Sequence, residues 1–349
     1  MKSHQNFTEL IPGLPEEIAL ECLTRLHYGA HAIASHVCQR WRNLLQSREL
    51  YYHRKRSGFT RKAACFVQSL PIHSESCSSN VKPEKQPKYG LSIFHPITGI
   101  WDQIDPVPKY PEGLPLFCQV ASSEGKLVVM GGWNPVSWEP LRDVFVYEFT
   151  TRKWTQRVNM PSTRSFFATG ASDGKVYVAG GHDENKNALR SAWVYDIAVD
   201  EWTELTPMSE ERDECEGVFV GSQFWVVSGY ETDSQGRFKN SAEVLDTTTG
   251  TWRRVEEAWG VSRCPRSCVA VGQNGNFTSW DEVEPAVQVG TCGVDLGDRS
   301  VVTGSAYQGA TQAVFVMEKS NQGQNDKLIK VDVPDEFSGF VQSGCLVDI

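Results

Sequence analysis

The sequence lacks several features that mark membrane, exported and metal-binding proteins. No hydrophobic run approaches the ~18–20 apolar residues that a membrane-spanning helix needs, and the N-terminal segment MKSHQNFTELIPG has no apolar signal core. Ten cysteines are present, but none forms a CxxC pair, and zinc sites are usually built from such tight pairs. We expect a soluble cytoplasmic or nuclear protein with free thiols, without metal, cofactor or membrane contact.

Catalytic motifs are also missing. The chain has no GxSxG, no P-loop and no HExxH sequence, and four of its eight histidines fall within residues 27–53. With no motif to supply a nucleophile, a phosphate cradle or a metal, we predict a protein that is not an enzyme.

The charge is unevenly distributed along the chain. The net charge of the 349 residues is −9, yet residues 1–62 carry 10 Lys and Arg against 5 Asp and Glu. In the remainder, 24 basic residues face 38 acidic ones. This split indicates two modules with different partners, and the acidic larger module is not expected to bind nucleic acid.

A repeat of about 50 residues dominates the larger module. Tryptophan follows an aromatic residue or leucine by seven positions at four places: Phe94 and Trp101, Tyr147 and Trp154, Tyr195 and Trp202, Leu245 and Trp252. Upstream of the last three lie β-rich runs that end in small residues, namely LVVMGG, VYVAGG and WVVSGY. Each unit reads as a four-stranded antiparallel sheet that buries its faces only against neighbouring sheets, with the aromatic residues packed between them.

This unit of Gly-Gly, then Tyr, then Trp seven residues later resembles the kelch β-propeller repeat. The resemblance implies a mostly β propeller over residues 57–349, with six blades, or five as the alternative. Residues 266–290 would form a degenerate blade and residues 291–333 another. The first blade begins at its second strand (residues 63–70), so we predict that the C-terminal run FVQSGCLVDI supplies the missing strand and closes the ring.

Residues 9–56 read as a separate all-α module. The segment LIPGLPEEIALECLTRL has a Leu14-Pro15 start followed by acidic residues, which favours a helix, and its apolar residues lie at helical spacing. After a turn at Gly29, HAIASHVCQRWRNLLQS carries a second apolar stripe. So small a core is marginal, and some apolar surface is expected to await a partner.

This module resembles the F-box, in its Leu-Pro start, its Ile/Leu-rich helix and its closing Val-Cys-x-x-Trp-Arg. F-boxes dock on a Skp-type adaptor, which links them to the cullin and RING subunits of a ubiquitin ligase. By position, the residues that would serve in this contact or in the module's own core are Leu14, Pro15, Ile18, Leu23, Leu26, Val37, Cys38 and Trp41. The sequence departs from the family pattern at residues 28–31, which lack the usual Leu and Arg, and we expect weaker adaptor binding as a result.

An F-box followed by kelch repeats is typical of plant proteins, and residues 289–309 and 336–349 resemble the plant kelch-domain F-box group. Members of that group are associated with turnover of phenylalanine ammonia-lyase and other phenylpropanoid enzymes, and of cytokinin response regulators. The resemblance implies a substrate receptor of an SCF (Skp–cullin–F-box) ubiquitin ligase with a protein target of this class. The alternative is a kelch scaffold or cytoskeletal binder. A radical-copper oxidase also uses such a propeller, but the sequence offers neither export nor metal-ligand spacing.

Target binding is expected at one rim of the propeller. Aligning the repeats places three arginines just before the first strands of successive blades: Arg164, Arg212 and Arg266. In kelch substrate adaptors, arginines at this location face the central pocket, where a ring of guanidinium groups would suit an acidic segment. The alternative is a set of solvated loop arginines with local neutralisation, as the four acidic residues around Arg212 indicate.

Overall fold

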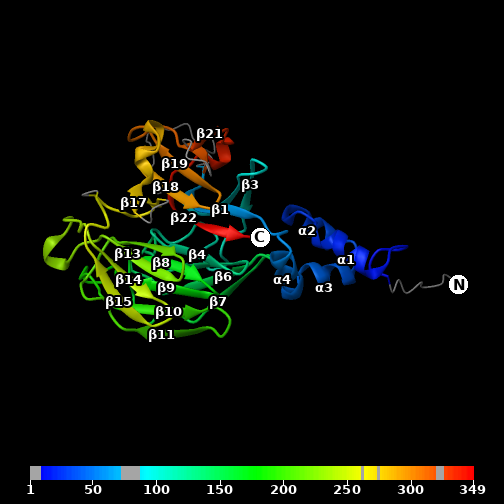
Figure 1. Ribbon diagram of the computed structural model, residues 1–349, viewed down its shortest axis with the longest axis horizontal. Coiled ribbons are helices and arrows are strands. Elements are labelled where there is room, and N and C mark those ends of the chain that lie inside the picture. The colour runs from blue at the N-terminus through cyan, green and yellow to red at the C-terminus, as the bar shows by residue number, and fades with distance from the viewer. Residues whose placement is uncertain (1–8, 72–86, 261–262, 273–275, 320–325) are drawn as a thin grey trace.

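The computed structural model describes residues 9–71, 87–260, 263–272, 276–319 and 326–349. A small helical module precedes a large β module, and the helices lie at one end of the molecule's long axis (Figure 1). They are α1 (Glu16–Thr24), α2 (Tyr28–Ala34), α3 (Gln39–Leu45) and α4 (Arg48–Arg56). Within the described ranges, no helix has the length and apolar character needed to cross a bilayer.

Local sequence explains where the helices begin. Pro15 precedes α1, whose first turn carries two glutamates. The second apolar stripe is divided between two helices, because the chain turns after Ala34. The next helix, α3, begins at Gln39 and is capped by Cys38, whose Sγ accepts the Trp41 N–H at 3.4 Å. The fourth helix, α4, is capped by the Ser47 side chain and ends in a basic turn.

The described strands form five four-stranded antiparallel sheets and one two-stranded sheet. Four of the five follow one another from the first blade onward: β22 (Val341–Asp348), β1 (Lys62–Ser69), β2 (Tyr89–His95) and β3 (Ile100–Ile104); β4 (Gln119–Ser123), β5 (Lys126–Met130), β6 (Val144–Glu148) and β7 (Lys153–Arg157); β8 (Ala168–Ser172), β9 (Lys175–Ala179), β10 (Ala192–Asp196) and β11 (Glu201–Leu205); β12 (Glu216–Val220), β13 (Gln223–Val227), β14 (Ala242–Asp246) and β15 (Thr251–Val255).

The remaining strands follow β15. The two-stranded sheet contains β16 (Val269–Val271) and β17 (Phe277–Ser279), and the fifth four-stranded sheet contains β18 (Val289–Asp295), β19 (Arg299–Ser305), β20 (Ala313–Glu318) and β21 (Lys327–Val331). Short 3-10 turns lie between them and elsewhere: η1 (Thr232–Ser234), η2 (Trp280–Glu282), η3 (Pro285–Val287) and η4 (Asp335–Phe337).

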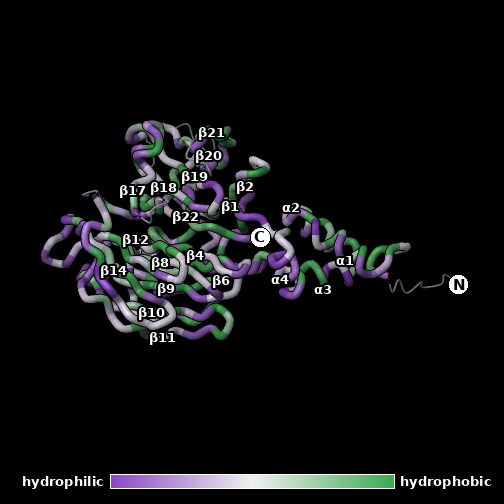
Figure 2. The backbone as a smooth tube through the Cα atoms, in the orientation of Figure 1, coloured by the Kyte–Doolittle hydropathy of each residue, from purple (hydrophilic) through white to green (hydrophobic). Residues whose placement is uncertain are grey.

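The first strands of the sheets surround a common axis. Going round it, β22 contacts β4, β4 contacts β8, β8 contacts β12, and β16 and β18 complete the circuit back to β22. Figure 2 shows hydrophobic residues within the body of the propeller, where β5 and β9 are buried over four of their five residues, whereas the outermost strand β11 has no buried residue. Five blades are thus complete, and the predicted count of six is not confirmed, since the described part of residues 266–290 supplies only a two-stranded sheet.

Ring closure follows the prediction from the sequence. The C-terminal strand β22 pairs with β1 in antiparallel register, from Lys62 opposite Asp348 to Gln68 opposite Val341. The first blade is therefore built from both ends of the β module. β1 therefore has a strand partner on each edge, β22 and β2, and does not offer an open edge for aggregation.

The repeated tryptophans attach each outer strand to the preceding blade. Each lies directly opposite the aromatic or leucine residue seven positions earlier, as Tyr147 lies opposite Trp154. The indole N–H of Trp154 donates to the Asp105 carbonyl at 2.8 Å, and that of Trp252 donates to the Thr206 carbonyl at 2.7 Å. The repeat spacing thus encodes a cross-strand pair, and at Trp154, Trp202 and Trp252 also a hydrogen bond to the preceding blade, whereas the Trp101 ring stacks on Phe337.

The glycine pairs are required by a close backbone approach. Gly180 and Gly181 both have positive φ, and a Cβ on Gly181 would lie 2.3 Å from the Ser165 carbonyl oxygen. In the next blade, Ser228 takes the first position with φ 61°, while Gly229 keeps the second, where a Cβ would lie 2.8 Å from a carbonyl oxygen. The first glycine is replaced by serine in the fourth blade, but in the third blade a Cβ on Gly180 would lie 2.5 Å from the Arg212 carbonyl oxygen, so both glycines are required there.

Deleting residues 340–349 is expected to lower the melting temperature by roughly 10 °C or more, because β1 would lose its inner partner together with the buried Val341 and Val347. Differential scanning calorimetry measures the change. Substituting Ile329→Thr on the exposed strand β21 is the control and is expected to leave the transition in place. If the truncated chain had the same melting temperature as the full chain, closure of the ring by β22 would be contradicted.

Candidate functional site

The helical module exposes several large apolar side chains. Ile18 is 52% exposed, Val37 62% and Leu14 36%, and Pro15 and Cys38 are also exposed. An ion pair between Glu16 and Arg40 joins the start of α1 to the start of α3, so the segments that carry these residues are neighbours in the module. Exposed apolar groups at this density mark a protein-binding surface.

The remaining predicted contact residues belong to the module's interior. Leu23 is 2% exposed, and Leu26 and Trp41 are partly buried against the module's apolar clusters. The Trp41 indole N–H donates to the Leu10 carbonyl at 2.6 Å. The structure thus separates the eight predicted residues into five that are exposed and three that hold the module together. Ile33, 78% exposed, lies in the second apolar stripe but was not among the predicted contacts.

The sequence of α2, which departs from the F-box pattern, contributes to the contact between the helical module and the propeller. We call this contact the seam. Tyr28 is buried, its hydroxyl donates to the Phe149 carbonyl at 3.2 Å, and the Arg152 guanidinium lies 4.8 Å from its ring centre. Burial and the neighbouring Arg54 lower the pKa of His31 to about 4, so its imidazole is neutral at pH 7. Tyr28 therefore attaches the helical module to the second blade, whereas His31 contacts Leu26 and Arg54 within the module.

Helix α4 adds the other half of the seam. Arg48 donates to Glu148 at 3.0 Å, and the Tyr52 hydroxyl donates to Glu124 at 2.9 Å. The Tyr51 ring packs on Gly125, where a Cβ would lie 2.6 Å from a ring carbon. The backbone of Arg61 exchanges two hydrogen bonds with Ile349 at the C-terminus. Contacts to the first and second blades at once hold the module in one orientation.

Arg164 and Arg212 lie inside the propeller, exposing 1% and 0% of their surface. Arg164 donates to the carbonyls of Gly180 at 3.1 Å and Ser191 at 3.2 Å, and Arg212 makes the equivalent bonds in the next blade. Each guanidinium thus ties the end of a second strand to the start of a third. The sequence offered two alternatives for these arginines, a ring that faces the central pocket or a set of solvated loop residues, and the structure shows neither. Their burial argues against contact with a target.

Their charges are satisfied differently. Arg212 also meets the buried carboxylate of Glu243 at 3.3 Å. Arg164 has no carboxylate within ion-pair distance in the described chain, and burial lowers its pKa to about 10, which still leaves it charged at pH 7. Backbone carbonyls and hydroxyls alone therefore solvate the Arg164 guanidinium.

Arg266 does not share this environment. Arg164 and Arg212 each precede a residue of positive φ by two positions, whereas Arg266 precedes Ser267, with φ 56°, by only one. The repeat alignment was thus one residue out of register here. The partly exposed Arg266 guanidinium lies 4.2 Å from the ring centre of Phe166, at the mouth of the propeller, and its target contact stays a prediction.

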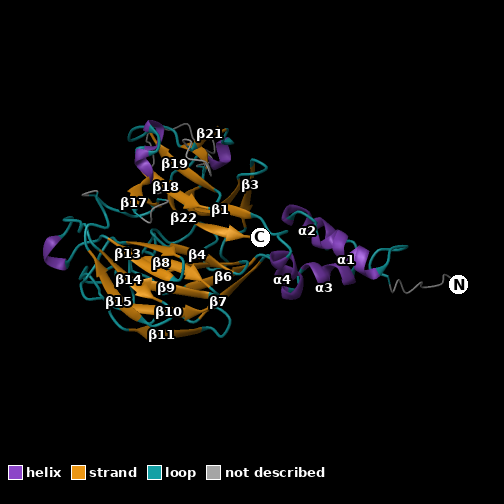
Figure 3. Cartoon of the chain, in the orientation of Figure 1, coloured by secondary structure: helices purple, strands orange, loops and turns teal. Residues whose placement is uncertain are grey.

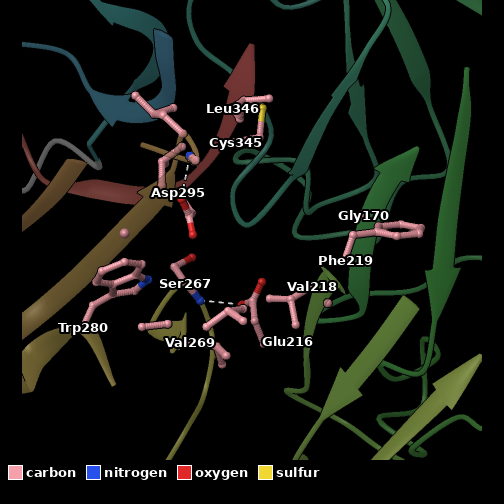
Figure 4. Close-up of a pocket in the computed structure, with 18 of the residues that line it drawn as sticks. Gly170, Glu216, Val218, Phe219, Ser267, Val269, Trp280, Asp295, Cys345 and Leu346 are labelled. Carbon is pink, nitrogen blue, oxygen red and sulfur yellow. Dashed lines mark hydrogen bonds between the residues drawn. The ribbon is translucent and has the colours of Figure 1, made fainter. Parts of the chain in front are cut away.

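A cavity of about 810 Å³ runs along the propeller axis and is lined by the inner strands. Figure 4 shows Glu216 facing Ser267, whose backbone N–H donates to the carboxylate at 2.5 Å. Burial raises the Glu216 pKa to about 7. No Lys or Arg lies within ion-pair distance of Glu216 across the described ranges, so burial is only partly offset there.

Two family models match the chain where these modules lie. The F-box domain model matches residues 11–53, and the KLHDC2/KLHL20/DRC7 Kelch-repeats domain model matches residues 79–277, more than half of the chain. The four-helix module with its exposed apolar surface and the propeller behind it together define an F-box protein with kelch repeats.

Curated relatives place the chain more closely. It is similar to three Arabidopsis thaliana proteins: F-box/kelch-repeat protein At2g44130, 41% identical over 79% of this chain and 72% of the relative; At1g15670, 36% identical over 98% and 100%; and At1g80440, 38% identical over 76% and 75%. The chain belongs to the plant F-box/kelch-repeat family.

Substituting Arg164→Met is expected to reduce the free energy of unfolding by about 3 kcal/mol, because it leaves buried carbonyls without a donor. Chemical denaturation measures the loss. The exposed Arg190→Met serves as the control and is expected to change stability by less than about 0.5 kcal/mol. Equal stability of the two variants would show that the buried guanidinium is dispensable.

Substituting Glu216→Gln is expected to stabilise the protein at pH 8 but not at pH 5. Because the folded-state pKa of about 7 lies above the ordinary value of 4.5, this group's stabilisation is present below pH 4.5 and is lost as the pH rises through 7. Glutamine keeps an acceptor for Ser267 and does not titrate. Thermal unfolding at the two pH values measures the change in melting temperature of Glu216→Gln. The control is Glu204→Gln, at an exposed position on the outer strand β11. A gain that is the same at both pH values would contradict this assignment.

Proposed function

We propose that the protein is the substrate-recognition subunit of an SCF ubiquitin ligase. Residues 9–56 would bind a Skp-type adaptor, and through it cullin and RING subunits, while residues 57–349 would bind the target protein. The observation that carries the proposal is the exposed apolar surface of Leu14, Pro15, Ile18, Val37 and Cys38 on a module that matches the F-box.

The mechanism is proximity rather than bond chemistry. A receptor that holds the target near a charged conjugating enzyme raises the local concentration of target lysines, and it needs no catalytic residue of its own. The seam supports this, because the contacts of α2 and α4 with the first two blades fix the direction in which the propeller faces. Phenylalanine ammonia-lyase or a response regulator is the proposed target, in the cytoplasm or the nucleus.

Substituting both Ile18→Asp and Val37→Asp is expected to weaken adaptor binding by roughly thirtyfold or more, because the charges would be desolvated in an apolar contact. Calorimetric titration of a purified Skp-type adaptor into the full chain measures this. The melting temperature is expected to stay unchanged, since both side chains face solvent.

The matched control is Ile97→Asp, an equally exposed apolar residue on the first blade, which is expected to leave adaptor binding intact. If the unsubstituted chain does not bind the adaptor, the protein is better explained as a kelch scaffold. The departure of residues 28–31 from the F-box pattern would then be the first explanation to test for the loss of binding.

A further inference from the structure

Two cysteines lie opposite each other in the strand pair that closes the ring. In the antiparallel register of β1 with β22, Cys65 is the direct partner of Cys345. Figure 3 shows the two strands as neighbours, with β22 ending at the C-terminus. Because one cysteine lies near the start of the propeller and the other near its end, only closure of the ring brings the two thiols together.

The separation of the two backbones at this pair suits a disulfide bond. Arg61 and Ile349 exchange both of their backbone hydrogen bonds, so hydrogen-bonded pairs recur at every second residue from there and include Cys65 with Cys345. The Cα atoms of such a pair lie about 5.5 Å apart, and disulfides most often join Cα atoms about 5.5–6 Å apart. A bond between the two sulfurs therefore fits the spacing of the strands.

Both side chains point to the same face of the first blade. Cys65 belongs to the apolar cluster between the first and second blades, and Cys345 packs against the same cluster. A hydrogen bond with the Cys65 thiol, and then burial, hold the pKa of Cys345 well above its usual range. The two thiols are thus in contact across the strand pair, as a disulfide requires.

A small oxidant can reach this pair from the propeller axis. Cys65 is fully buried, but Cys345 is partly exposed and lines the axial cavity of about 810 Å³ (Figure 4). The neighbouring inner strand β18 carries another thiol, Cys292, which belongs to the apolar cluster on the other face of the blade. Cys65 is therefore the partner that the fold presents to Cys345.

We propose that Cys65 and Cys345 form a redox modification site, at which a hydroperoxide joins β1 to β22 by a disulfide bond and locks the closed ring. The inference is independent of the proposed ligase role. It adds a covalent latch at the strand pair that completes the inner circuit of the propeller.

The reaction has two steps. The deprotonated Cys345 sulfur attacks one oxygen of hydrogen peroxide and the O–O bond breaks, so that Cys345 becomes a sulfenic acid and the other oxygen leaves as water with the proton that the thiol lost. The Cys65 sulfur then attacks the Cys345 sulfur, the S–O bond breaks, and a second water leaves with the Cys65 proton. Two thiols lose two electrons in total, and one peroxide is reduced to two waters.

The latch forms slowly. The raised pKa keeps the Cys345 thiol protonated at pH 7, and the thiolate is the reactive form, so a brief exposure to oxidant leaves the pair reduced. Once formed, the bond joins the two ends of the propeller, and a cross-link that closes so long a loop stabilises the folded chain more than one that closes a short loop. The site therefore responds to sustained oxidation.

The test is oxidation of the folded full chain with hydrogen peroxide, followed by blocking of the remaining thiols and peptide mapping by mass spectrometry. We expect a linked pair of peptides whose fragmentation assigns the bond to Cys65 and Cys345, and which dithiothreitol separates. The control is the same chain oxidised in concentrated urea, where this link is expected to be a minor product among ten cysteines.

Two results of the mapping would overturn the inference. One is a link from Cys345 to Cys292 in place of Cys65. The other is complete oxidation of the exposed Cys22 and Cys38 with no link between Cys65 and Cys345. Neither result depends on a substituted chain, so the test stands even where a variant folds poorly.

Thermal unfolding measures the lock. Oxidation is expected to raise the melting temperature of the unsubstituted chain by about 5 °C or more, and dithiothreitol is expected to reverse the rise. Cys345→Ala and Cys65→Ala, each compared with its own reduced form, are expected to lose it. The matched control is Cys118→Ala, a fully buried thiol of the same apolar cluster outside the strand pair, which is expected to keep the rise. An equal rise in Cys345→Ala would reject the latch.

Discussion

Everything in this molecule depends on the pairing of its last strand with its first. β22 lies between β1 and the second blade, so the inner circuit of strands is complete only when the C-terminus has returned to residue 62. The same pairing brings Ile349 to Arg61 and Asp348 to Tyr51, at the seam with the helices. Ring closure therefore also adds contacts to the attachment of the helical module, beside those that α2 and α4 make with the second blade.

Within the ring, each blade repeats the same contacts with local substitutions. Tryptophan joins an outer strand to the preceding blade, the second glycine admits a neighbouring carbonyl, and a buried arginine in the third and fourth blades ties second strand to third. The blade of β18 to β21 keeps four strands without the tryptophan or the buried arginine, whereas the described part of residues 266–290 forms only two strands. The repeat residues thus reinforce a blade, and the ring tolerates their loss at more than one position.

The two surfaces with functional potential lie at opposite ends of the inner strands. The helical module exposes Ile18 and Val37 beyond one rim, and the other rim exposes Trp138 and Tyr307. The seam between module and propeller uses buried aromatic rings and ion pairs, so the two surfaces keep a constant relation to each other. Such separation suits a receptor, since one partner can bind without displacing the other.

Much of the fold could be predicted from the sequence alone, because periodic residues encode local pairings. The seven-residue spacing of Tyr147 and Trp154 determines a cross-strand pair, and the absence of a strand before residue 63 predicted closure by the C-terminus. The site could be predicted only in part. Whether Leu23 or Ile18 faces solvent, and whether Arg164 lines a pocket or binds carbonyls, depends on residues far away in the chain. Side-chain direction and solvation are properties of the packed ring, and only the tertiary structure decided them.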